Sequence, residues 1–548
     1  MLGIDPNQKR EYVVTVRKDV DWKIIHDELV HDTSADDNVD SNIIPDRECE
    51  CVKERENNRR NTHYSLTENE AIRLRNDPRI TGVVAIADIT SPKPRAIQEG
   101  NFNRNNTSTG NHDNWGLLRH INQTNTFNNS TSDPGGTYDY VLDGSGVDVI
   151  IVDTGIQVGH PEWQDTNGVT RLQQIDWFAE SGIAGTQPAG FYTDVDGHGT
   201  HCIGTMAGKT FGWAKNARIY SITLYGNSGN ELSTSDALDC ILGFHNAKGG
   251  SRPTVVNMSF GYVWYLKTNV TPNQFSVDGT TWFDISGGRY RGVTHSDTAY
   301  ADLQNYGLIG ELQGGSIYGF PRKYASLDAD VETLINNGIH VCIAAGNDSM
   351  KIDVPGGIDY DNYLSFENGG DTYYVYYHRG GTPSVNEGGD TLTLGTQDSP
   401  TGDLNEGFMV GALENSDLLD GSFFKDKKTT FSQSGPGVNI YTAGRYIISA
   451  QPNTKGSPYF ADSNYKQSKY SGTSMAAPQM VGMVACLLQA HPDWTPAQVK
   501  KYFESNAVSN LNDTGNNNDY TINTTIHGGP NRVAYFPMHG QRPFSVGE

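Results

Sequence analysis

The sequence lacks any apolar run approaching the ~20 residues that a membrane-spanning helix needs. Its first residues, MLGIDPNQKREYVVTV, lack the apolar core of a secretion signal. Positive charge is also deficient, since the formal net charge is −23 at pH 7. An acidic chain of this kind is not expected to bind nucleic acid or anionic membranes. We therefore expect neither partner, and the missing leader favours an intracellular or particle-associated protein over a secreted one.

Cysteine is scarce, with six residues in a chain of 548. Cys49 and Cys51 are too close in sequence for an easy mutual disulfide, whereas Cys202, Cys342 and Cys486 lie in apolar runs typical of core positions. The pattern predicts reduced thiols rather than a disulfide framework.

The first ninety residues have the pattern of a small α+β unit. Short β-type runs, EYVVTV, HYSL and GVVAIADI, alternate with two helical segments, DWKIIHDELV and TENEAIRLRNDP. The second helix starts with Thr67 and Glu70 in capping-box spacing. Residues 31–61 are polar, charged and without a clear period, so we expect an exposed insertion there. We assign residues 1–90 to this unit.

Residues 91–113 are rich in Pro, Gly, Asn and Ser and are the best linker candidate. Beyond them, the runs VDVIIVDTGI, ARIYSITLYG, PTVVNMSFG and HVCIAAGN are typical of strands buried on both faces. Helical stretches at 201–207, 233–246 and 329–337 lie between them. The alternation predicts an α/β fold, a mostly parallel sheet with helices on both faces, over residues 114–508. Functional residues of such sheets gather at the carboxyl ends of the strands.

Two long Gly-, Asp- and Tyr-rich segments, 262–326 and 348–406, interrupt this rhythm and are predicted to be insertions with small sheets of their own. Two interpretations stay open: they narrow a substrate cleft, or they are surface decoration. A polar tail is expected over 509–548, after a helix that Thr495 caps.

Three residues stand where chemistry is feasible: Asp153 at the end of VIIVD, His198 in DVDGHGTHC, and Ser474 in YSGTSMAAPQM. Each alone has a plain structural interpretation, as a turn residue, a loop histidine and a helix N-cap. Together they have the parts of a nucleophilic site. A serine hydroxyl needs an imidazole to take its proton, and the imidazole needs a carboxylate to fix its tautomer.

Asn347 ends the strand run IAAGN and is a fourth candidate. Its amide can donate to the oxyanion of a tetrahedral intermediate, beside the N–H of Ser474. Losing one such donor costs roughly 3–4 kcal/mol of transition-state stabilisation. The alternative is a simple turn residue after Gly346.

The motifs IVDTGI, GHGTHC, NMSFG, AAGN and SGTSMAAP occur in the order found in the subtilisin-like serine proteases, and the chain resembles that family over residues 114–508 apart from the insertions. HGTHC, with Cys202 after the histidines, is similar to the proteinase K branch. The resemblance implies that Asp153, His198 and Ser474 are the catalytic triad and that Asn347 is the oxyanion donor. It implies a serine endopeptidase acting on protein or peptide substrates.

The resemblance also implies the substrate-binding residues. Ser259, Phe260 and Gly261 would form an edge strand that pairs with the substrate backbone, a mode that carries little sequence information. Ala344, Ala345 and Gly346 would line the pocket for the residue before the cut. The loop 226–231, with Ser228 and Gly229, would flank the other side. Phe260 stands where the family usually has Leu.

The N-terminal unit resembles the inhibitory propeptides of the same family, and WGLLRHI (115–121) resembles the start of a mature domain. This implies a self-inhibited precursor that cleaves itself within residues 89–113. No cofactor is implied as a requirement. Calcium as a structural ion is compatible with the oxygen-rich loops, but the sequence identifies no metal ligands.

A second hypothesis is a catalytically silent or assembly-dedicated structural protein that retains the protease fold, with contacts made by the insertions. The complete set of four candidate residues argues against it, because a scaffold has no chemical need for them.

Overall fold

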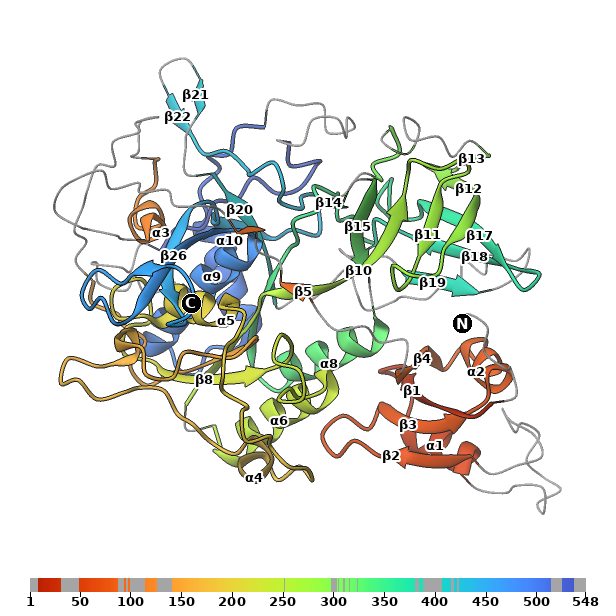
Figure 1. Cartoon of the computed structure of the whole chain (residues 1–548), viewed down its shortest axis with the longest axis horizontal. Coiled ribbons are helices and arrows are strands. Elements are labelled where there is room, and N and C mark those ends of the chain that lie inside the picture. Colours follow the sequence, from red (N-terminus) through yellow and green to blue (C-terminus); the bar gives the residue numbers. More distant parts are fainter. Residues whose placement is uncertain are drawn as a thin grey trace.

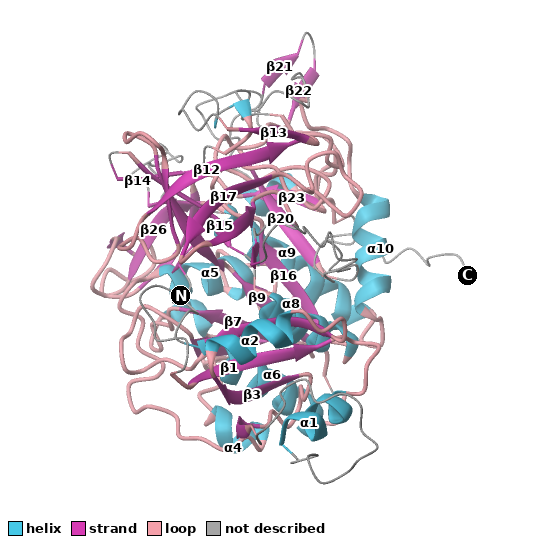
Figure 2. Ribbon diagram, turned by 90° about the vertical axis from the view of Figure 1, so that its right-hand side faces the viewer, coloured by secondary structure: helices cyan, strands magenta, loops and turns pink. Residues whose placement is uncertain are grey.

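The computed structural model of the chain describes residues 8–30, 49–86, 93–94, 97–98, 114–125, 140–250, 252–296, 303, 305–308, 311–314, 316–322, 324–379, 384–387, 407–414, 418–420, 423–513 and 525–536. At its centre lies a six-stranded sheet in the order β23-β20-β16-β9-β7-β8, with every neighbouring pair parallel (Figures 1 and 2). Its strands are β7 (Asp148–Asp153), β8 (Arg218–Thr223), β9 (Thr254–Met258), β16 (His340–Ala344), β20 (Phe408–Leu413) and β23 (Ile440–Ala443).

Helices cover both faces of this sheet, so the predicted α/β fold is confirmed. One face holds α5 (His198–Ala207) and α9 (Thr473–Ala490), and the other holds α6 (Thr234–Ala247) and α8 (Ala325–Asn336). Strand β7 shows why its residues are apolar throughout: Val149 and Ile151 enter the first core, whereas Ile150 and Val152 enter the second.

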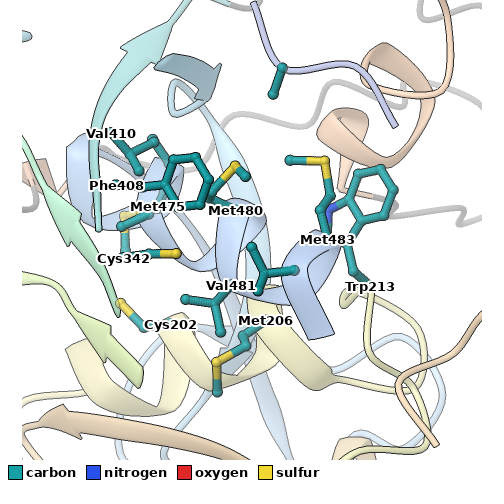
Figure 3. Close-up of a cluster of buried hydrophobic side chains, with 14 of the residues drawn as sticks. Cys202, Met206, Trp213, Cys342, Phe408, Val410, Met475, Met480, Val481 and Met483 are labelled. Atoms are coloured by element: carbon teal, nitrogen blue, oxygen red, sulfur yellow. The ribbon is translucent and has the colours of Figure 1, made fainter. Parts of the chain in front are cut away.

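The larger core is built around α9 (Figure 3). Met475, Met480 and Val481 of α9 pack there with Met206 of α5 and with Val410 of β20. Small residues between these side chains let the helix approach closely: a Cβ added at Gly482 would lie 2.7 Å from the carbonyl oxygen of Met206. This packing fixes the start of α9 against the carboxyl ends of the strands.

Between residues 114 and 513, the described part of the chain also contains a small antiparallel sheet and three further helices. The sheet contains β24 (Ile447–Gln451), β25 (Ser457–Pro458) and β26 (Lys466–Ser471). The helices are α3 (Trp115–Arg119), α4 (Trp177–Ser181) and α10 (Pro496–Asn506), with a 3-10 turn at Pro161–Trp163 and a short hairpin of β21 (Leu418–Asp420) and β22 (Phe423–Lys425).

The segment expected to be a polar tail contributes to the core over residues 525–536. Ile526, Val533 and Phe536 are buried in the α9 core, and Val533 N–H donates to Val508 O at 2.9 Å. The polar composition around this segment conceals the few apolar side chains that anchor it.

The two predicted insertions form one shared antiparallel sheet rather than separate small sheets (Figure 1, green). Strand β12 of the first insertion pairs with β17 of the second, and Phe275 stacks on Phe366 with ring centroids 5.0 Å apart. The strands are β10 (Phe260–Lys267), β11 (Gln274–Ser276), β12 (Phe283–Tyr290), β13 (Val293–His295), β14 (Glu311–Gly314), β15 (Ile317–Arg322), β17 (Tyr363–Asn368), β18 (Asp371–Tyr376) and β19 (Ser384–Glu387).

The N-terminal unit is an antiparallel sheet in the order β2-β3-β1-β4 with two helices. Its elements are β1 (Arg10–Val16), α1 (Trp22–Val30), β2 (Glu50–Lys53), β3 (Asn61–Leu66), α2 (Glu68–Arg75) and β4 (Ile80–Ala85). The capping box of Thr67 and Glu70 is present, as predicted. Figure 2 shows this sheet beside α8.

The expectation of an exposed insertion over 31–61 holds only in part for residues 49–61, where Arg55, Asn58 and Asn61 are buried, while 31–48 lie outside the described residues. Arg55 is only 1% exposed because it forms two-pronged ion pairs with Asp239 of α6 and Asp330 of α8, at 2.7–2.9 Å. Asn58 and Asn61 also donate to Asp330 Oδ1. From the sequence, a charged side chain such as that of Arg55 is expected to be exposed. Here it is buried because two acids from helices distant in sequence pair with it.

All six cysteines are free, which confirms the predicted reduced thiols. Among the described residues, no helix has both the length and the apolar character needed to cross a bilayer.

Candidate active site

Asp153 and His198 meet at the carboxyl end of the central sheet. Asp153 is the last residue of β7, and His198 is the first residue of α5, after Gly197 at φ 96°. His198 Nδ1 lies 2.7 Å from Asp153 Oδ1, and both side chains are buried. The acid therefore accepts from Nδ1–H, which leaves Nε2 as the basic nitrogen. Within the described part of the chain, His198 Nε2 has no hydrogen-bond partner.

Ser474 lies at the start of α9, next to this pair. The N-cap of α9 is Gly472, so the alternative that Ser474 caps the helix is wrong. Ser474 Oγ donates to Ser259 O at 3.1 Å, and Ser259 Oγ donates to Ser474 O at 3.0 Å. This reciprocal pair joins the helix start to the end of β9.

The Cys202 thiol links Ser474 and His198. Its Sγ donates to Ser474 O at 3.3 Å and lies 3.9 Å from His198 Nδ1. The serine and histidine segments are thus in contact with one sulfur atom. Asp153, His198 and Cys202 also form the group of metal-ligand residue types found among the described residues, with ligand atoms within 4.8 Å of one another. Because the His198 and Asp153 atoms are already bonded to each other, we interpret this group as part of the serine site. A structural calcium ion stays a prediction.

The electrostatics of the buried pair favour a basic histidine. Burial alone would lower the pKa of His198, but attraction to the Asp153 carboxylate raises this pKa well above its ordinary value. Burial raises the pKa of the Cys202 thiol. His198 therefore has a stronger affinity for a proton than a free imidazole.

Asn347 lies beside the start of α9. Its Oδ1 accepts from both the N–H and the hydroxyl of Thr473, each at 3.0 Å. The Thr473 hydroxyl also accepts from Gly346 N–H at 3.0 Å. Thr473, a residue that the sequence patterns did not single out, thus fixes the orientation of the Asn347 amide relative to Ser474.

The predicted substrate edge is paired with the protein's own chain. Phe260 pairs with Pro94 and Gly261 with Lys93, where residues 93–94 form β5 (Lys93–Pro94). Strand β6 (Ile97–Gln98) pairs with β26, which leads directly into Ser474. Figure 1 shows β5 beside the start of β10. The linker therefore contacts both sides of the site.

The insertion sheet limits how far this edge extends. From Tyr265 to Lys267, β10 pairs with β11 on one side and with β15 on the other. A backbone has two hydrogen-bonding edges, so these residues have none left for a substrate. Only the first part of β10 can accept an added strand.

The remaining predicted substrate residues lie at the same end of the sheet. Ala344 ends β16, and Ala345 N–H donates to Val410 O at 3.0 Å, so this stretch is firmly held beside β20. The loop with Ser228 and Gly229 follows β8, and a Cβ added at Gly229 would meet nothing within 4 Å. The stretch with Ala344 and Ala345 therefore forms a rigid side of the candidate site, whereas the loop with Ser228 and Gly229 lies at its open edge.

Comparison with known proteins identifies the family of this parallel α/β fold. The model of the subtilase family (Peptidase_S8) matches residues 144–522. The chain belongs to the subtilase family.

Two curated relatives illustrate the similarity. A "cuticle-degrading serine protease" of Arthrobotrys oligospora is 25% identical over 73% of this chain and 63% of its own length. An "extracellular serine proteinase" of Thermus sp. is 24% identical over 82% of this chain and 72% of its own. The match thus spans less than two thirds of the first relative.

Among solved structures, fervidolysin from Fervidobacterium pennivorans, "a keratinolytic enzyme related to subtilisin", matches with a TM-score of 0.50. It is 17% identical, and the match covers 98% of this chain and 62% of that one. This likeness supports the fold.

Proposed function

We propose that this protein is a serine endopeptidase made as a self-inhibited precursor. The observation that carries the proposal is the 2.7 Å contact between His198 Nδ1 and Asp153 Oδ1, next to the start of the Ser474 helix. In this proposal Ser474 is the nucleophile, His198 the general base and Asp153 the acid that orients the imidazole. Membership of the subtilase family supports the same reaction.

The reaction starts with a rotation of the Ser474 hydroxyl from Ser259 O toward His198 Nε2. His198 takes the hydroxyl proton as Oγ attacks the carbonyl carbon of the peptide bond. The oxyanion is stabilised by the Asn347 amide and the Ser474 N–H, one of the N–H groups at a helix start that lack an intrahelical acceptor. The imidazolium then protonates the leaving amine, and water releases the acyl group by the same route.

Substrates would bind as the linker does. An extended peptide adds to the edge at Phe260 and Gly261, so main-chain groups supply most of the recognition. Ala344, Ala345 and Gly346 would form the wall beside the residue before the cut, and Ser228 and Gly229 the opposite rim.

The N-terminal unit would act as the intramolecular inhibitor. Its Arg55 anchors it on α6 and α8, and the linker that follows pairs with β10 and then with β26. Only residues 95 and 96 separate the two paired dipeptides. We therefore expect self-cleavage at the Arg95–Ala96 bond, inside the 89–113 region that the sequence suggests.

The test of activity uses the full chain with a denatured protein as substrate, with and without a serine-directed phosphonyl or sulfonyl reagent. We expect hydrolysis that the reagent abolishes and that Ser474→Ala lacks. Hydrolysis that survives both changes contradicts the proposal. A stable higher assembly without turnover would instead support a structural role for the fold.

A further inference from the structure

Tyr225 is tied to the Asp153 and His198 pair although no motif marks it. In the parallel register of β7 and β8, Thr223 lies opposite Asp153. The next residue, Leu224, donates its N–H to Asp153 O at 2.7 Å. Tyr225 follows, with its side chain only 5% exposed. The backbone therefore holds this phenol at a fixed place beside the acid.

The Tyr225 hydroxyl contacts both members of the pair. It donates to Asp153 Oδ1 at 3.3 Å and lies 3.5 Å from His198 Nδ1. The same carboxylate oxygen accepts from His198 Nδ1 at 2.7 Å and from Thr154 N–H at 2.8 Å. Asp153 Oδ2 has no hydrogen-bond partner among the described residues. Three donors thus compete for one oxygen.

We propose that Tyr225 is a positioning residue of this site: its phenol shares the Asp153 oxygen that orients His198 and so limits how strongly the carboxylate holds the imidazole proton. The inference rests on the proposed function, since it concerns the base of that reaction. A donor that withdraws charge from a carboxylate weakens the attraction between the carboxylate and its cationic partner. Tyr225 would therefore keep His198 able to release its proton to the leaving group.

The surroundings keep the phenol in place as a donor. Its ring packs edge-on against Phe260, with centroids 6.2 Å apart. Burial and the nearby Asp153 charge raise the pKa of Tyr225 well above its ordinary value, so it stays protonated at neutral pH. The other groups that face His198 are Cys202 from α5 and Asp196, whose Oδ1 accepts from His198 N–H at 3.2 Å. His201, one turn along α5, is buried, and burial lowers its pKa to about 3.

The test removes the hydroxyl alone, with Tyr225→Phe in the full chain. The matched control is Tyr220→Phe, a buried tyrosine of β8 whose ring packs against Trp177 and Phe244. The first readout is proton NMR of the His198 Nδ1–H resonance against pH, in a Ser474→Ala background that prevents self-digestion. We expect the titration midpoint to rise by roughly half a unit to one unit in Tyr225→Phe and to stay unchanged in Tyr220→Phe.

The second readout is the pH profile of kcat/KM in the active chain. In Tyr225→Phe, kcat/KM should fall about 3- to 10-fold at pH values below the midpoint and change little at alkaline pH. This factor is the expected pKa shift of His198 expressed as a rate. The inference predicts that the His198 midpoint rises when the phenol hydroxyl is removed. A midpoint that is unchanged or lower in a folded Tyr225→Phe variant therefore overturns it. Absence of turnover in the wild type would refute the proposed function, whereas the NMR arm still decides the role of Tyr225.

Discussion

Gly261 of β10 pairs in antiparallel register with Lys93, so the edge that a substrate would use is occupied by the chain's own linker. The next described dipeptide, Ile97–Gln98, pairs with β26 just before Ser474. An intramolecular strand of this kind competes at high effective concentration with any free peptide. In the proposed precursor, activation would therefore require that the linker be cut and displaced.

Self-cleavage should depend on Ser474. We expect wild type to lose its N-terminal segment and to acquire Ala96 as a new N-terminus, whereas Ser474→Ala stays full length. Mass spectrometry and N-terminal sequencing measure both. The control is Ser505→Ala, on an exposed position of α10, which should mature normally. Fully active wild type that still begins at Met1 would contradict the precursor scheme, and a cut elsewhere would contradict the register argument.

The Asn347 amide should matter for the rate and little for binding. Asn347→Asp keeps the oxygen that accepts from Thr473 but replaces the donor that would face the oxyanion. We expect kcat to fall by roughly 10²–10³-fold with KM nearly unchanged. Steady-state kinetics on a peptide substrate measure both, with Asn167→Asp on an exposed turn as control. A variant that changes KM alone would show that Asn347 binds the ground state instead.

The pH dependence follows from the raised pKa of His198. General-base catalysis requires the neutral imidazole, so a higher pKa moves the acidic limb of kcat/KM to higher pH, with its midpoint above the ordinary value of 6.5. Asp153→Asn removes the attraction and leaves burial as the main effect, which lowers the pKa. We expect its limb at lower pH and a plateau reduced by roughly four orders of magnitude. A midpoint that stays in place in this variant would exclude Asp153 as the charge that tunes His198.

Arg55 should control how long the cleaved N-terminal unit stays bound. Arg55→Ala leaves Asp239 and Asp330 as buried acids without their cation, which costs about 3–5 kcal/mol. We expect the fragment to co-elute with the catalytic unit in wild type and to dissociate in the variant, by size-exclusion chromatography after quenching with a serine reagent. Arg59→Ala, whose ion pair with Glu54 is largely exposed, is the control and should behave as wild type. Retention of the fragment in both variants would show that the sheet contact alone holds it.

Phe536 tests the contribution of the C-terminal segment to stability. Its ring is fully buried against Trp213 and Phe503. Phe536→Ala should lower the free energy of unfolding by roughly 3–5 kcal/mol, because it leaves a cavity in the α9 core. Denaturant unfolding in the Ser474→Ala background measures this, and Tyr535→Ala, a half-buried neighbour, should lose less. If Phe536→Ala lowered the free energy of unfolding no more than Tyr535→Ala does, the Phe536 ring would not be part of the cooperative core.

The sequence by itself determined the α/β architecture, the family and the four candidate residues Asp153, His198, Ser474 and Asn347. These features are local: a strand buried on both faces is apolar throughout, and a residue at a strand end or helix start stands next to glycine and small side chains. Motifs of this kind are legible without coordinates because backbone geometry dictates the residue types within a few positions.

Only the tertiary structure decided the contacts between distant segments. The sequence suggests that Arg55 is a surface charge, and only the structure shows its ion pairs with Asp239 and Asp330. Likewise, Tyr225 has no distinctive sequence context, and only the pairing of β8 with β7 brings it next to Asp153. The shared sheet of the two insertions and the pairing of Gly261 with Lys93 have the same origin. Burial, partner and register at such positions depend on segments far away along the chain, and no local pattern encodes them.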